Sequence, residues 1–259
     1  MKKKLWIIIV AILLLVLVGG YLGYKIYYVN YYDLSHIQNF EKIRENFVIN
    51  EKKLTVTTTT LAEGEYFTYK NMKMKNIFDG YQSMYNSDEF EFPHSADSIW
   101  YVLKDNNLNK QIAAVGLARD ESTYQQYKSG AVVFGDSRVG EIKELSKFFE
   151  KNEITNDIEL LKFFDKTKND KNSIFDSVEN MKTFYSLHLL NATTYGNIED
   201  IILIDGNYEG YIMKYNMGGV TMIECNVLKD EKRYGITFNN STYFTDEMIK
   251  DLLNTLVIE

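Results

Sequence analysis

The first 25 residues place the strongest constraint on this chain. Three lysines precede a run that carries no charged residue from Leu5 to Tyr24. A helix of this length, rising about 1.5 Å per residue, extends about 30 Å, which is the thickness of the hydrocarbon core of a bilayer. Residues 1–25 are therefore predicted to form an uncleaved transmembrane signal-anchor. The membrane-anchor residues expected within it are Leu5, Trp6, Val18 and Tyr24.

The charges that flank the apolar run predict its orientation. Three lysines precede it and only Lys25 follows directly, so the positive-inside rule places the N-terminus in the cytoplasm. We expect a single pass through the cell membrane, with residues 26–259 extracytoplasmic. Six tyrosines between residues 21 and 32 fit an aromatic belt at the outer interface. The alternative is a cleaved signal peptide, for which Val18-Gly19-Gly20 offers small residues at the cleavage site.

The remainder of the chain has the composition of a folded, acidic protein. Of 259 residues, 45% are hydrophobic and the formal net charge is −7. The four lysines of the first 25 residues set aside, 25 basic residues remain against 36 acidic ones, a net charge of −11. Such a charge argues against nucleic-acid binding, and it favours either a soluble domain that anionic lipid repels or a basic partner. The only cysteine, Cys225, excludes an intramolecular disulfide.

Residues 26–135 are predicted to form the first part of the extracytoplasmic domain. The segment 33–47 has near-helical apolar spacing, with Ser35 as its N-cap. Residues 79–97 show no clean period and are expected to be a mobile or binding loop. The strands expected from β-branched and apolar runs cover 52–60, 65–75, 98–104, 111–118 and 131–134, of which 98–104 and 111–118 form a hairpin.

Residues 136–259 are predicted to form a C-terminal α+β part. Apolar spacing indicates helices between 141 and 194 and over 246–257, the last capped by Thr245. Short turns separate the four strands in between, so they should be antiparallel neighbours in a meander. The predicted class is α+β, with antiparallel sheets and packed helices in an α/β/α sandwich-like order. The four strands are expected over 200–205, 208–217, 220–229 and 232–238.

The C-terminal quarter resembles a known kind of domain. A strand ending in Tyr-x-Ile-Thr-Phe, at residues 234–238, is followed by an amphipathic helix and a short apolar tail. This pattern, over roughly residues 200–259, resembles the end of PsbP-like α/β/α sandwich domains. It is also similar to uncharacterised membrane-anchored proteins of low-GC Gram-positive bacteria. The resemblance implies binding or assembly, and it brings no catalytic residue with it.

One short motif raises the question of catalysis. Gly135-Asp136-Ser137 follows an apolar run, as the nucleophile does in Gly-Asp-Ser hydrolases. Those enzymes need an Asp-x-x-His pair near the C-terminus, whereas His36, His94 and His188 are the only histidines here. The only Asp-x-x-His, residues 33–36, precedes the serine. A strand that ends in a capped turn explains the motif, so no catalytic residue is expected.

Metal and cofactor motifs are weak in this sequence. Asp205-Gly-Asn-Tyr-Glu-Gly210 matches the first half of a calcium loop, but Asn216 stands where the bidentate Glu is needed. A hairpin turn is expected there instead. Three scattered histidines and one cysteine give no ligand pair at usable spacing, and no phosphate-binding glycine loop occurs. We therefore expect no metal and no cofactor.

These features together predict a membrane-tethered, extracytoplasmic, non-enzymatic domain that binds a protein partner or ligand at the cell surface. An immunity-type protein that neutralises an incoming toxin is one concrete version. Two alternatives stay open: a cell-surface serine hydrolase that uses Ser137, and a structural protein of envelope assembly. The identity of the partner and the oligomeric state do not follow from the sequence.

Overall fold

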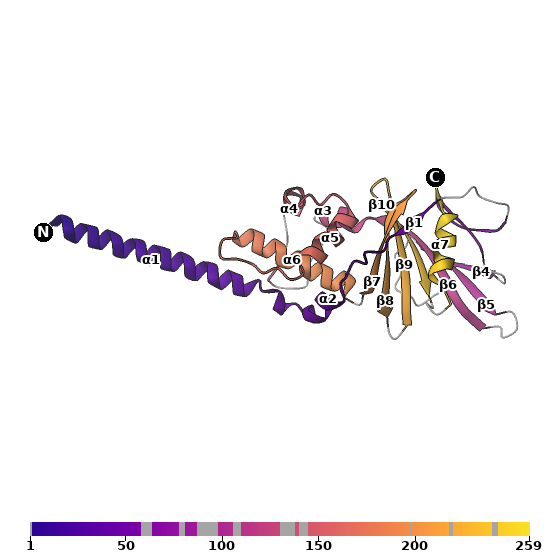
Figure 1. Ribbon diagram of the computed structural model, residues 1–259, viewed down its shortest axis with the longest axis horizontal. Coiled ribbons are helices and arrows are strands. Elements are labelled where there is room, and N and C mark those ends of the chain that lie inside the picture. The colour runs from indigo at the N-terminus through magenta and orange to yellow at the C-terminus, as the bar shows by residue number, and fades with distance from the viewer. Residues whose placement is uncertain are drawn as a thin grey trace.

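Figure 1 shows the computed structural model of the chain, a long helix followed by a mixed α+β body. The prediction of an α+β protein with a long N-terminal apolar helix is confirmed. The structure describes residues 2–57, 64–77, 81–86, 98–105, 110–129, 138–139, 145–196, 198–217, 220–239 and 243–259.

The first helix, α1 (Lys2–Tyr31), contains the whole predicted anchor and continues past it. It is long and apolar enough to cross a membrane, and none of its apolar window is buried by the rest of the protein. Trp6, Val18 and Tyr24 have exposed side chains, and Leu5 lies within the helix. The run lacks proline, so the backbone hydrogen bonds that a bilayer demands continue without interruption.

The last turns of α1 and the residue after it belong to the core of the body. Tyr32 is buried, and Tyr28, Val29 and Tyr31 pack against the same core. The Tyr32 ring lies 5.9 Å from that of Tyr185 in α6 (Val178–Tyr195). Part of the expected aromatic belt is therefore a packing surface, because α1 does not stop at the end of the apolar run but docks on the domain.

The body is built around one large sheet with strand order β1-β7-β8-β9-β10-β6-β5-β4. All neighbours are antiparallel except β1, which pairs in parallel with β7. The expectation of a purely antiparallel sheet is wrong at this edge, since the long chain between β1 and β7 supplies the crossover that a parallel pair needs. The strands are β1 (Leu54–Val56), β4 (Tyr81–Asn86), β5 (Ser98–Asp105), β6 (Lys110–Glu121), β7 (Ile198–Gly206), β8 (Glu209–Met217), β9 (Val220–Lys229) and β10 (Lys232–Asn239).

A second, three-stranded sheet has the order β11-β3-β2. Its strands are β2 (Tyr66–Tyr69), β3 (Met72–Lys75) and β11 (Val257–Ile258). The single strand expected over 65–75 is thus a hairpin, which turns where Lys70 adopts a left-handed backbone with φ of 54°. The sequence did not reveal this turn, because aromatic residues precede Lys70, alternating methionines follow it, and no glycine or proline marks it.

The loop expected over 79–97 contains a strand. Residues 81–86 form β4, which pairs with β5 at the edge of the large sheet, and 87–97 lie outside the described residues. The hairpin of β5 and β6 is confirmed. The strand expected over 131–134 also lies outside the described part.

Side-chain oxygens cap most of the helices. Ser122, Asn156, Ser177 and Thr245 each accept a hydrogen bond from the backbone N–H three residues on. Ser35 was wrongly expected to be a cap: Asp33 accepts from the Ser35 N–H and begins a short 3₁₀ turn, η1 (Leu34–His36). The other helices are α2 (Phe40–Asn46), α3 (Thr123–Lys128), α4 (Leu145–Lys151), α5 (Asp157–Thr167) and α7 (Asp246–Asn254), the last ending before β11.

Each face of the large sheet is covered by its own core. The helix-side core joins α2, α5 and α6 to one face of β7 and β8, and includes Phe47, Phe164, Tyr185, Ile201 and Tyr211. The α7-side core joins α7 and the small sheet to the other face, and includes Phe67, Met74, Leu117, Phe238 and Leu252. Strands of both predicted parts share the sheet, since β6 pairs with β10. The division into 26–135 and 136–259 stays a prediction.

Candidate functional site

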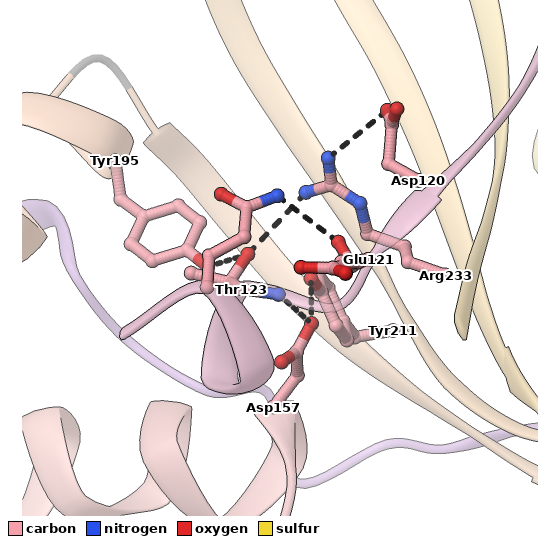
Figure 2. A network of polar contacts seen from close by, with 8 residues as sticks. Asp120, Glu121, Thr123, Asp157, Tyr195, Tyr211 and Arg233 are labelled. Atoms are coloured by element: carbon pink, nitrogen blue, oxygen red, sulfur yellow. Dashed lines mark hydrogen bonds and ion pairs between the residues drawn. The ribbon is translucent and has the colours of Figure 1, made fainter. Parts of the chain in front are cut away.

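A buried polar cluster lies where α3, α5 and α6 meet the large sheet (Figure 2). We call it the Asp157 cluster. Its members are Asp120, Thr123, Asp157, Tyr195, Tyr211 and Arg233. Asp157 stands at the first position of α5 and is only 1% exposed. Its carboxylate accepts hydrogen bonds from the backbone N–H of Thr123 at 3.1 Å and of Tyr124 at 2.6 Å. The Tyr211 hydroxyl of β8 donates to it at 3.2 Å.

These three hydrogen bonds satisfy two backbone N–H groups and one hydroxyl, which are buried and would otherwise have no acceptor. The first N–H groups of a helix have no partner within the helix, and α3 begins at Thr123. A carboxylate at this position also lies at the positive end of the helix dipole. Asp157 therefore ties the beginnings of α3 and α5 to strand β8, and the carboxylate is occupied by structural hydrogen bonds.

Arg233 supplies the positive charge of the cluster. Its Nη1 donates to the Thr123 hydroxyl at 3.3 Å, and its Nη2 lies 3.6 Å from an Asp120 carboxylate oxygen. Burial by itself lowers the pKa of Arg233, but the neighbouring Tyr211, Glu224, Tyr195 and Asp157 outweigh it and leave the pKa raised. The guanidinium therefore stays charged beside Asp120 and Asp157.

The tyrosines of the cluster stay protonated. Burial raises the pKa of both Tyr195 and Tyr211, and the nearby Asp157 adds to the effect. The Tyr195 hydroxyl donates to Thr123 at 3.4 Å. The hydrogen bonds of Asp157, Thr123 and Tyr211 therefore fasten α3 and α5 to the sheet.

Asp157→Ala should lower the free energy of unfolding by about 3–5 kcal/mol, because two buried N–H groups lose their acceptor and Arg233 loses a nearby negative charge. Tyr211→Phe, which removes one of the donors, should cost about 1 kcal/mol. Urea unfolding of the full-length protein in detergent measures both. A loss for Asp157→Ala no larger than that for Tyr211→Phe would contradict this assignment.

The second feature is an open groove of about 620 Å³ between α2, the C-terminal end of α6 and strands β7 to β9. Its floor is apolar, and its rim is polar. Tyr215 on the rim donates a hydrogen bond to Glu224; burial, reinforced by this carboxylate, raises the pKa of the Tyr215 hydroxyl. Floor residues are Ile37, Ile43, Tyr195, Ile198 and Met213, and rim residues are Gln38, Asn39, Lys42, Thr193, Tyr215 and Glu224.

The described histidines are engaged in the fold. His188 is fully buried, and its Nε2 lies 3.1 Å from the Thr167 hydroxyl. His36 Nε2 lies 3.0 Å from the Asn30 carbonyl oxygen, and the Asp33 carboxylate accepts from Ser35. The Asp-x-x-His pattern is thus a capped turn at the end of α1. Ser137 and His94 lie outside the described residues.

The calcium-loop-like segment and the single cysteine have structural roles in the fold. Residues 205–210 form the predicted hairpin turn between β7 and β8. Gly206 adopts φ of 103°, and a Cβ there would lie 2.2 Å from the Val56 carbonyl oxygen. Cys225 is buried, and burial raises the pKa of its thiol. Within the described ranges, no group of three or more His, Cys, Asp or Glu side chains is arranged to hold a metal ion.

Sequence reasoning missed both features. Asp157 has a side chain that is common at the start of any helix, and Arg233 lies in a strand that was predicted from its apolar residues. The charged residue at the second position of the predicted strand 232–238 is the signal that could have marked Arg233. The groove could not have been found, because its walls come from segments far apart in the chain.

Comparison with known proteins gives no relative: no protein-family model, no curated protein and no solved structure matches this chain.

His188 should make the fold sensitive to acid. Burial lowers its pKa to about 3, whereas an unfolded chain has a histidine pKa near 6.5. Between these values the unfolded state binds more protons, so the stability present above about pH 6.5 is lost as the pH falls towards 3. In His188→Leu, the change in unfolding free energy between about pH 7.5 and pH 5 should shrink by about 2 kcal/mol.

Urea unfolding at the two pH values measures this change. His36→Gln, which replaces a histidine with an exposed side chain, is the matched control for the loss of one histidine. Equal pH dependence in His188→Leu and the wild type would show that His188 is not the responsible group.

Proposed function

We propose that this protein is a non-enzymatic, extracytoplasmic binding domain tethered to the cell membrane by α1. The length and apolar surface of α1 support a single pass, and the excess of lysines before it supports a cytoplasmic N-terminus. The exposed body then comprises the residues that follow the span. We further interpret its layers as α/β/α sandwich-like, with β7 to β10 as the predicted meander of a PsbP-like domain.

The groove carries the proposal. An apolar floor with a few polar groups on the rim is typical of a site that buries a ligand and orients it. Lys42 and Glu224 give the rim one charge of each sign, and Tyr215 holds Glu224 by a hydrogen bond. These groups suit a partner segment that presents an apolar side chain beside a charged one.

The position of the groove supports access from outside the membrane. The N-terminal end of α6 lies beside α1, whereas its C-terminal end lines the groove. Eighteen helical residues separate the two ends by about 27 Å. The groove would therefore open well beyond the headgroups, where a soluble partner can reach it.

The partner we favour is a basic protein. The body carries an excess of acidic residues, and opposite net charges speed association. An immunity-type interaction with an incoming toxin is one version of this function. The two described histidines are engaged in the fold, which favours a binding role over catalysis.

Blocking the groove should abolish the interaction. Thr193 is exposed on the wall formed by α6, and Thr193→Trp would fill the space above the apolar floor. Tagged full-length protein, purified from solubilised membranes, should recover a reproducible partner. Thr193→Trp should lower that recovery about tenfold or more.

Lys250→Trp is the matched control, since Lys250 is exposed on α7 at the opposite face of the sheet. This variant should retain the partner. A partner recovered equally well with Thr193→Trp, or no partner from any of the three proteins, would refute the groove as the binding site.

A further inference from the structure

The connection between α5 and α6 exposes one large aromatic side chain. Phe175 is 91% exposed, more than Leu15, which at 72% is the most exposed large apolar side chain described in α1. Among the described residues outside α1, Val48 and Ile77 are the other large apolar side chains that are exposed, and both are less exposed than Phe175. A phenylalanine this open to water needs a physical explanation.

The exposure comes from an ordered turn. The Ser173 N–H donates to the Asp176 carboxylate at 2.7 Å, and the Asp176 N–H donates back to the Ser173 carbonyl at 3.0 Å. The Phe175 N–H lies 3.3 Å from the Ser173 hydroxyl, which accepts from it. The turn over 173–176 therefore holds the Phe175 ring away from the body.

Two contacts place this turn beside the outer end of the apolar run. The Lys25 ammonium donates to the Asp176 carbonyl oxygen, and Lys25 is only 6% exposed. The Asn172 side-chain amide donates to the Tyr32 carbonyl oxygen at 2.8 Å. Figure 1 shows the same arrangement, with the α5–α6 connection reaching alongside the end of α1.

The depth of this turn follows from the length of the span. If Leu5 to Tyr24 fill the hydrocarbon core, Lys25 lies about 1.5 Å beyond it, and the headgroup layer is about 5–8 Å thick. The Asp176 backbone, which contacts the Lys25 side chain, then lies within the reach of the headgroups. Phe175 is its neighbour in the chain.

We infer that the turn over 173–176 is a second membrane contact, in which Phe175 inserts into the interfacial region of the bilayer. This inference rests on the proposed membrane anchoring by α1. We take the lipid surface to be the partner of Phe175, because the contact of Lys25 with Asp176 places the turn at the level where α1 would leave the membrane. Aromatic rings are stabilised in this region, which is apolar on one side and hydrated on the other.

Tryptophan fluorescence in lipid nanodiscs tests the contact. In a full-length background with Trp6→Phe and Trp100→Phe, Phe175→Trp places the only tryptophan in the turn. The nanodiscs contain phosphatidylcholine and phosphatidylglycerol, with or without bromine atoms near the top of the acyl chains. The emission of the Phe175→Trp protein should be blue-shifted in both lipids and quenched by the brominated one.

Val48→Trp in the same background is the matched control. Val48 is 50% exposed and follows α2, whose Ile43 lies by Gly196 at the far end of α6. Its emission should be unaffected by bromine. A third protein, which keeps only Trp6, reports whether α1 itself enters the bilayer and should be quenched.

The outcomes separate the two proposals. Quenching of Trp6 without quenching of the Phe175→Trp protein overturns the second contact and leaves the anchor intact. A blue shift of the Phe175→Trp emission without quenching also overturns it, and indicates contact with a protein or a second copy. If the emission of Trp6 is not quenched, membrane anchoring by α1 is overturned, and the basis of this inference is lost with it.

Discussion

The junction between α1 and the body is the interaction on which the rest depends. A terminal helix that is long and apolar enough to cross a membrane can lead into a flexible segment, but here the last turns of α1 are part of the helix-side core. Tyr32 packs on Tyr185, and Lys25 is buried against the carbonyl of Asp176. A buried ammonium must be hydrogen-bonded, and the Asp176 carbonyl oxygen of the body is the acceptor that Lys25 uses. The body is therefore mounted on the helix in a fixed orientation.

A second constraint, the Asp157 cluster, carries this orientation on to the sheet. Asp157 joins the beginnings of α3 and α5 to β8, and Tyr195 at the end of α6 reaches Thr123. Tyr195 also forms part of the floor of the groove. The chain of contacts from α1 through α6 to the cluster thus fixes where the groove lies relative to α1. This is a physical reason for the polar cluster in an otherwise apolar core: it positions the helices rather than adding stability over an apolar alternative.

The sequence predicted what local patterns encode. The apolar run gave α1, alternation gave the strands from β7 to β10, and Thr245 gave the beginning of α7. It did not predict the turn at Lys70, because a left-handed lysine carries no compositional signal. It gave no sign of the parallel pairing of β1 with β7 either, since pairing between distant segments has no local pattern.

The candidate site was less predictable than the fold. The groove and the Asp157 cluster are both built from side chains brought together by tertiary packing, such as Ile37 with Met213 and Asp157 with Arg233. The tyrosines at the end of α1 were expected to meet lipid, but the same residue type serves equally well in a core. Only the packing of α6 decides between the two for Tyr28 and Tyr32.

The rigid mounting of the body on α1 can be measured directly by the distance between two spin labels in nanodiscs. Ile26→Cys in α1 and Lys250→Cys in α7 are exposed positions, and the native Cys225 is buried and should not be labelled. Double electron–electron resonance should give one narrow distance distribution, which broadens in Tyr32→Ala as the junction loosens. A broad distribution in the protein with native Tyr32 would contradict a fixed junction between the helix and the body.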